Sequence, residues 1–179
     1  MKACFRNFLV ILLLLLSGCV SNNSTVNLDP NFLKQEYISL SDEYFAIEKY
    51  EKSLELLLKA NAINSDNSLD FKIARTAALA KDWALSLEYY NNLLEKDPNN
   101  LTIKKSLAWV TAQSGDLESA LKLYESLYNE ASYDTEIVKN YMLVSLALDN
   151  TELAQTILDE FAVINTDEKI LEELSSLMQ

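Results

Sequence analysis

The chain has 179 residues, of which 49% are hydrophobic, and it contains only two glycines and two prolines. This length suits one domain of moderate size, and so few turn-forming residues argue against a turn-rich β protein, whereas abundant Leu, Ala, Glu and Lys favour helices. The net charge of −12 and the absence of histidine argue against a nucleic-acid partner, and they remove the usual general base and the commonest metal ligand.

The first eighteen residues have the layout of a secretory signal. Lys2 and Arg6 carry positive charge, and residues 8–16 form an unbroken apolar run. A helix that spans a bilayer needs about 20 apolar residues, so this run is too short to span and fits the hydrophobic region of a signal peptide. We therefore assign residues 1–18 to a signal peptide.

The apolar run ends in Leu16-Ser17-Gly18-Cys19, which resembles the lipobox of bacterial lipoproteins. The resemblance implies cleavage before Cys19, a diacylglycerol on its sulfur, an acyl chain such as palmitate on its new amino group, and no other cofactor. Two or three acyl chains anchor a protein stably. Val20 follows the cysteine, as in outer-membrane sorting in enteric bacteria, so we expect a lipid-anchored envelope protein at the outer membrane, facing the periplasm. The alternatives are an ordinary signal peptide with a chance cysteine and an uncleaved anchor.

The mature chain is acidic and begins with a polar segment. Removal of residues 1–18 leaves 13 basic and 27 acidic residues, a net charge near −14, so anionic head groups should repel the domain and only the lipid should contact the membrane. Both cysteines lie within the first nineteen residues, which excludes a disulfide framework and zinc-like spacing. Residues 19–33 are expected to be the lipidated cysteine and a flexible tether.

A pattern of about 34 residues repeats from Lys34 onward. Its second-helix starts, at Tyr50, Trp83, Leu117 and Thr151, are 33, 34 and 34 residues apart. In each unit a small residue is followed, four residues later, by a large one. These pairs are Ser53 and Leu57, Ser86 and Tyr90, Ala120 and Tyr124, and Ala154 and Leu158. Small side chains let two antiparallel helices pack closely, and neighbouring hairpins must stack to bury their apolar faces.

The segment around Gly115 predicts the turn of a helical hairpin. Apolar residues recur at helical spacing on both sides of it. Gly115 can adopt a positive φ that closes the first helix, and the carboxylate of Asp116 can cap the second. In the fourth unit Asp149 and Asn150 make the turn without glycine, so we expect that repeat to be slightly distorted.

The period, the helix–turn–helix unit and the small/large pattern resemble tetratricopeptide repeats. The resemblance implies an all-α solenoid of about four antiparallel hairpins. Their predicted bounds are 34–67, 68–100, 101–134 and 135–166, followed by a capping helix at 167–179. A long helical bundle with accidental periodicity is the alternative interpretation.

The sequence offers little catalytic chemistry. Without histidine, and with Cys19 acylated, Ser–His and Cys–His arrangements are excluded. The loops lack the Asp/Asn pattern of a calcium site and the glycines of a phosphate cradle, and carboxylates spread along helices fit a solvated face. We therefore expect a protein that is not an enzyme and holds no metal.

The resemblance also implies a binding surface, because the first helix of each tetratricopeptide hairpin lines a concave groove. By position, the predicted partner-binding groove comprises Phe45, Phe71, Arg75, Lys105, Trp109, Gln113, Lys139 and Leu143, beside Ile38 and Asp42. Aromatic and arginine side chains are favoured at binding hot spots. The terminal-carboxylate clamp of some family members is not reproduced, because Trp109 stands where an asparagine is needed. Burial of Trp109 between helices, and a solvated rim for Lys105 and Lys139, are the alternatives.

Together these features predict a membrane-anchored adaptor or scaffold that binds other proteins or peptide segments in the cell envelope. One alternative is a component of an outer-membrane machine for barrel or for pilus and secretin assembly. Another is a surface-exposed structural lipoprotein. A third, an enzyme or transport component, needs a closed pocket with convergent polar groups, and the fold alone does not choose among them.

Overall fold

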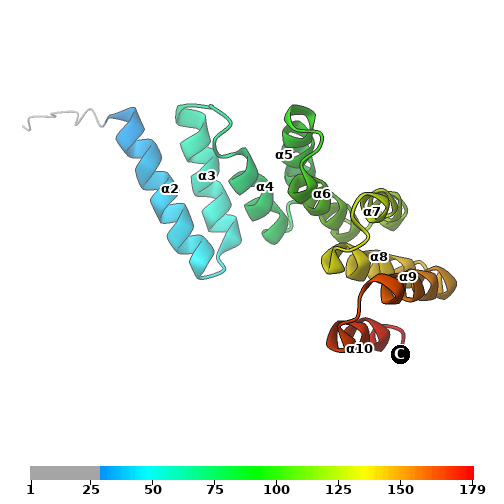
Figure 1. Ribbon diagram of the computed structural model, residues 1–179. Coiled ribbons are helices and arrows are strands. Elements are labelled where there is room, and N and C mark those ends of the chain that lie inside the picture. Colours follow the sequence, from blue (N-terminus) through cyan, green and yellow to red (C-terminus); the bar gives the residue numbers. More distant parts are fainter. Residues whose placement is uncertain (1–28) are drawn as a thin grey trace, which may run out of the picture.

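The computed structural model describes residues 29–179, and this part of the chain is all-α, as predicted (Figure 1). The predicted signal peptide, Cys19 and the start of the tether lie outside the described residues. The described residues form nine helices and no strand. The helices are α2 (Pro30–Ala46), α3 (Tyr50–Ile63), α4 (Asp70–Leu79), α5 (Trp83–Lys96), α6 (Leu101–Gln113), α7 (Leu117–Ala131), α8 (Thr135–Ala147), α9 (Thr151–Ile164) and α10 (Glu168–Ser176).

Consecutive helices pair into four hairpins, which stack in chain order with α10 against the end of the stack (Figure 1). The helix direction changes along the stack, so α8 and α9 run across the direction of α2 and α3 in this view. The predicted division at 67/68 falls within the linker between α3 and α4, and the divisions at 100/101 and 134/135 fall directly before the first residues of α6 and α8. This arrangement is the predicted solenoid, and no single compact bundle forms among the described residues.

The first hairpin begins earlier than the sequence predicts. The predicted tether reaches residue 33, whereas α2 begins at Pro30. The reason is local capping: Asp29 accepts a hydrogen bond from the backbone N–H of Asn31 at 3.0 Å, and a proline in the first turn already has a helical φ. The polar composition of this segment conceals the helix start.

Small residues lie where the two helices of a hairpin cross, as predicted. In the first hairpin the hydroxyl oxygens of Ser41 and Ser53 are 2.8 Å apart, and both residues are fully buried. In the second, the Ser86 hydroxyl donates to the carbonyl oxygen of Ala74 at 2.8 Å. The corresponding residues of the third hairpin are the buried Ala108 and Ala120. Close helix contact therefore depends on these positions.

Each of the four hairpin turns contains one residue with a positive φ. Gly115 has a φ of 95°, as predicted, and the equivalent residues Glu48, Lys81 and Asp149 have φ values of 58°, 61° and 57°. The expected distortion of the fourth repeat is absent at this position, because Asp149 adopts the same left-handed conformation without glycine. An L-residue is strained there, so three of the turns store a small local strain.

Aspartate and asparagine side chains cap most of the helices. The side chain of Asp116 accepts from the backbone N–H of Ser119 at 3.1 Å, as predicted. Each such cap satisfies a backbone donor that the helix leaves open. The capping residues are Asp29, Asp82, Asn100, Asp116, Asp134, Asn150 and Asp167.

The core extends along the stack as three successive clusters of buried side chains. Large residues fill the space between hairpins, with Leu57, Tyr124 and Phe161 almost fully buried. The outward face of α2 differs, since Leu40 is 41% exposed whereas the equivalent Ile73 is fully buried. An end face of a repeat array must tolerate water. Within residues 29–179 no helix is long and apolar enough to cross a bilayer.

Candidate functional site

The first helices of the hairpins present equivalent side chains to one surface. Helix α4 contributes Phe71 and Arg75, and α6 contributes Lys105 and Trp109 at the same repeat positions. Residues four apart lie on the same face of a helix, so each pair points in one direction. We call the surface bordered by these residues, and continued by α2 and α8, the groove.

One hollow of the groove, here the main hollow, lies between α4 and α6 and has a volume of about 520 Å³. Phe71, Arg75, Lys105 and Trp109 border it together with Tyr90, so it brings four predicted residues together. Phe71 is 40% exposed, and its ring meets the ring of Tyr90 edge-on at 5.9 Å between centroids. The main hollow thus has aromatic walls and two cations.

Trp109 is both packed between helices and partly exposed in the groove, the two placements that the sequence leaves open. Its ring packs edge-on against Trp83 at 6.4 Å between centroids, so one side of the indole belongs to the core. The residue is half-buried and also borders the main hollow. Packing against Trp83 fixes the ring, which presents a rigid apolar surface to the groove.

A small hollow of about 130 Å³ lies beside the main hollow, between α2 and α4. It is bordered by Asp42, Phe45, Phe71, Arg75 and Thr76, among others. The guanidinium carbon of Arg75 lies 4.7 Å from the centroid of the Phe45 ring, a distance typical of a cation–π contact. Phe71 and Arg75 therefore separate the small hollow from the main one.

A third hollow of about 250 Å³ continues the groove between α6 and α8. Trp109, Gln113 and Leu143 border it, and Leu143 is 41% exposed. Seven of the eight predicted groove residues thus border one of these three hollows. A separate polar hollow of about 290 Å³, bordered by Asn61, Tyr89 and other residues, contains none of them.

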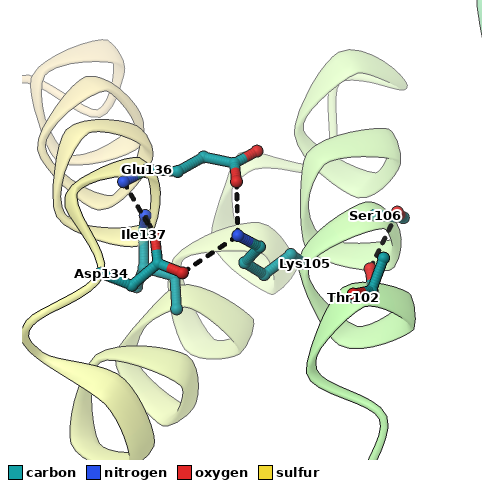
Figure 2. A network of polar contacts seen from close by, with 6 residues as sticks. All are labelled: Thr102, Lys105, Ser106, Asp134, Glu136 and Ile137. Carbon is teal, nitrogen blue, oxygen red and sulfur yellow. Dashed lines mark hydrogen bonds and ion pairs between the residues drawn. The ribbon is translucent and has the colours of Figure 1, made fainter.

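The two predicted groove lysines are held by carboxylates of the chain itself. Lys105 Nζ lies 3.0 Å from Asp134 and 2.5 Å from Glu136, as Figure 2 shows. Partial burial lowers the pKa of Lys105, but the hydrogen bonds to Glu136 and Asp134 outweigh it and raise the pKa above its usual value. Lys139 borders none of the three hollows and pairs with Glu173 of α10 at 2.5 Å. Lys105 thus joins the third repeat to the fourth, and Lys139 joins the fourth repeat to α10.

The sequence interpretation missed the partners of these lysines. Lys105 and Glu136 are 31 residues apart, and Lys139 and Glu173 are 34 residues apart. A lysine and a carboxylate separated by about one repeat are a signal that could have identified both pairs. It also missed Thr76, whose buried hydroxyl has no hydrogen-bond partner among the described residues.

The side chains that border the hollows define what the groove can offer a ligand. Among residues 29–179 there is no group of three or more His, Cys, Asp or Glu side chains that could hold a metal ion. What the hollows offer is aromatic surface with an arginine between them. Such a surface can take up apolar side chains and one negatively charged group.

Comparison with protein-family models finds no match for this sequence. Among curated proteins, an uncharacterized lipoprotein of Treponema pallidum (strain Nichols) is 25% identical over 110 residues. The matched region covers 61% of this chain and 56% of that protein, so the chain spans little more than half of its relative's length.

Several solved structures share the fold. One is YrrB, described as a TPR (tetratricopeptide-repeat) protein with an unusual peptide-binding site, at a TM-score of 0.65, 17% identity, and coverage of 80% of this chain and 74% of YrrB. A tetratricopeptide repeat protein from Parabacteroides merdae matches at 0.65 and 19% identity, covering 81% of this chain and 58% of that one. A thermophilic TPR protein from Thermus thermophilus matches at 0.56 and 21%, covering 81% and 82%. The chain therefore has the tetratricopeptide-repeat fold, and its sequence is similar to that of a treponemal lipoprotein.

Proposed function

We propose that this protein is a lipid-anchored scaffold of the bacterial cell envelope, and that it binds segments of partner proteins in the groove. The main hollow supports the proposal, because the exposed ring of Phe71 and the partly buried ring of Trp109 border a concavity of about 520 Å³. Exposed aromatic side chains in a concave surface are typical of binding sites for proteins and peptides. The shared fold of YrrB, described as having a peptide-binding site, supports a peptide ligand.

The proposed role is binding without catalysis. The cations of the main hollow are Arg75 and Lys105, and Lys105 is already paired with two carboxylates. Acid–base or nucleophilic chemistry needs a group that can exchange a proton or attack near neutral pH. A nucleic-acid partner is not proposed, since the mature chain has a net charge near −14.

In-cell crosslinking tests the groove. A photoreactive residue replaces Phe71, and a second variant carries it at Lys122, an exposed position of α7. We expect partner proteins to be captured from position 71 and not from position 122, with the captured proteins identified by mass spectrometry. The affinity of a captured partner should then fall for Phe71→Ala and Trp109→Ala. Normal binding by both folded variants would refute the groove.

The proposed membrane anchor is the lipid on Cys19, a residue outside the described part of the chain. The similarity to a treponemal lipoprotein supports it. Cys19→Ala should release the protein into the soluble envelope fraction, whereas Cys4→Ala, in the predicted signal peptide, should leave it membrane-bound. If the Cys19→Ala protein stays in the membrane fraction, the lipid anchor is wrong.

The proposed location is the periplasmic face of the outer membrane, where a scaffold can meet other envelope proteins. Protease added to intact cells should leave the protein uncut, and the same protease should digest it after the outer membrane is permeabilised. Digestion in intact cells would instead favour the surface-exposed lipoprotein.

A further inference from the structure

The charge of Arg75 has no carboxylate partner within 4.0 Å among residues 29–179. Its cationic neighbours in the groove differ. Lys72 binds both oxygens of Asp42, at 2.8 Å and 3.0 Å, and Lys105 binds two carboxylates at the start of α8. The groove therefore contains one cation whose hydrogen-bond donors are left for a ligand.

The side chain of Arg75 is held in place without using those donors. Its guanidinium stacks on the ring of Phe45 at 4.7 Å, and it borders both the main and the small hollow. A planar guanidinium that is already positioned loses little entropy when it forms two parallel hydrogen bonds to a carboxylate. The stacking thus prepares Arg75 for an anionic group that lies in the groove.

The residues around Arg75 determine which ligand side chains fit next to that anionic group. Phe71 lies between the two hollows, and Trp109 borders the far side of the main hollow. Asp42 and Lys72 also border the small hollow, so this end of the groove is not purely apolar. A polar group therefore fits at Arg75, and an apolar group fits between Phe71 and Trp109.

We infer that the segment bound in the groove contains an internal aspartate or glutamate whose carboxylate pairs with Arg75, next to an apolar side chain that occupies the main hollow. The inference rests on the proposed function and specifies the chemistry of its ligand. The segment carries one such carboxylate and is otherwise neutral or basic. The net charge of the mature chain, near −14, repels further acidic residues.

A random library of 12-residue peptides displayed on phage, selected on the full lipidated chain in detergent micelles, tests this inference. We expect the enriched sequences to share one acidic residue beside an aromatic or aliphatic residue. One enriched peptide is then synthesised with an amidated C-terminus, together with a version in which the acidic residue is replaced by its amide. The affinities of both peptides are measured by calorimetry.

Arg75→Gln should weaken binding of the acidic peptide at least about tenfold, because a charge-assisted pair is lost, and should leave the weaker amide peptide almost unchanged. Lys122→Gln removes the same charge from the exposed face of α7 and should not alter either affinity. Peptides that require Phe71 but show no acidic residue, or that bind Arg75→Gln normally, would overturn the inference and leave the proposed function standing. Selection of no peptide that depends on Phe71 or Trp109 would overturn both.

Discussion

Lys105 and Glu136 connect the third hairpin to the fourth, with 2.5 Å between the ammonium nitrogen and a carboxylate oxygen (Figure 2). The same ammonium lies 3.0 Å from Asp134. Asp134 also accepts hydrogen bonds from the backbone N–H groups of Glu136 and Ile137, at 2.9 Å and 3.3 Å. One carboxylate therefore caps α8 and holds a groove lysine, so the start of the helix and the wall of the main hollow are coupled.

Asp134→Ala should destabilise the fold more than Glu136→Ala. The Asp134 side chain is only 22% exposed. Its replacement removes both the ion pair with Lys105 and the cap of α8, so the free energy of unfolding should fall by about 1–2 kcal/mol. The Glu136 side chain is 64% exposed, and a solvent-screened ion pair of this kind contributes at most about 0.5–1 kcal/mol. Urea unfolding followed by circular dichroism measures both values. Equal losses would show that the cap adds nothing to the ion pair.

The core pattern of this fold could be predicted from sequence because packing acts on single positions. Ser53 and Ala120 are small since two helices touch there, and Tyr124 is large since it fills the space between hairpins. Each requirement recurs once per repeat, so four imperfect copies of the residue pattern support the same assignment of helices and buried positions. The start of α2 at Pro30 lacks this support, because a single cap at Asp29 decides it.

The groove could be predicted as a set of positions, but the geometry that pairs some of its cations and leaves Arg75 unpaired could not. Repeat position places Arg75 and Lys105 on one surface. Whether each cation is paired depends on how neighbouring hairpins rotate against each other, which brings Glu136 to Lys105 and no carboxylate of the described residues to Arg75. That rotation follows from the packing of many side chains and has no local signature in the sequence.

Acid should destabilise the protein between about pH 4 and pH 2. Hydrogen bonds from Ser68 and Lys34 lower the pKa of Asp66 from 3.8 to about 2. Partial burial raises the pKa of Asp134, but the pair with Lys105 and the helix N–H groups lower it more, so the net shift is downward. A carboxyl with a lower pKa in the folded state stabilises the fold above the unfolded pKa of about 3.9. That stability is lost as the pH falls toward the folded pKa.

Melting temperatures measured from pH 6 to pH 2 test this pH dependence. Asp66→Asn cannot titrate at this position, so its melting temperature should be lower at pH 6 and should fall less steeply toward pH 2. A wild-type curve that stays flat down to pH 2 would contradict the role assigned to these carboxylates.

Reductant at pH 7 should not shift the melting temperature, because both cysteines precede the folded repeats.

Gly115→Ala should destabilise the third hairpin through the backbone alone. A Cβ atom at Gly115 would meet no atom within 4 Å, but φ is 95°, and an L-residue in a left-handed conformation loses about 1 kcal/mol. Lys81→Gly should do the reverse. It relieves the strain at φ 61° and should add about 0.5 kcal/mol after the entropy of glycine is subtracted.

Lys122→Gly is the matched control for the turn prediction. Lys122 is exposed within α7, where glycine should lower the free energy of unfolding by about 1 kcal/mol. Guanidinium unfolding of the three variants gives the comparison. If Lys81→Gly and Lys122→Gly lose the same stability, the turn at Lys81 does not have a left-handed conformation in solution.

Thr76→Val should stabilise the fold. Thr76 is fully buried, and its hydroxyl oxygen has no hydrogen-bond partner among the described residues, which disfavours the folded state. Valine has nearly the same shape, and the equivalent residues of the next two repeats are the buried Val110 and Val144. We expect the free energy of unfolding to rise by about 1 kcal/mol.

Thr111→Val tests whether this gain belongs to the unpaired hydroxyl. Thr111 is also buried in a first helix, but its hydroxyl donates to the carbonyl oxygen of Leu107 at 2.8 Å. Its replacement removes a satisfied group and should be neutral or slightly destabilising. Equal gains for Thr76→Val and Thr111→Val would mean that apolar burial alone is responsible. A gain confined to Thr76 would show that the second repeat keeps a destabilising polar group at the border of the small hollow, where the groove meets Arg75.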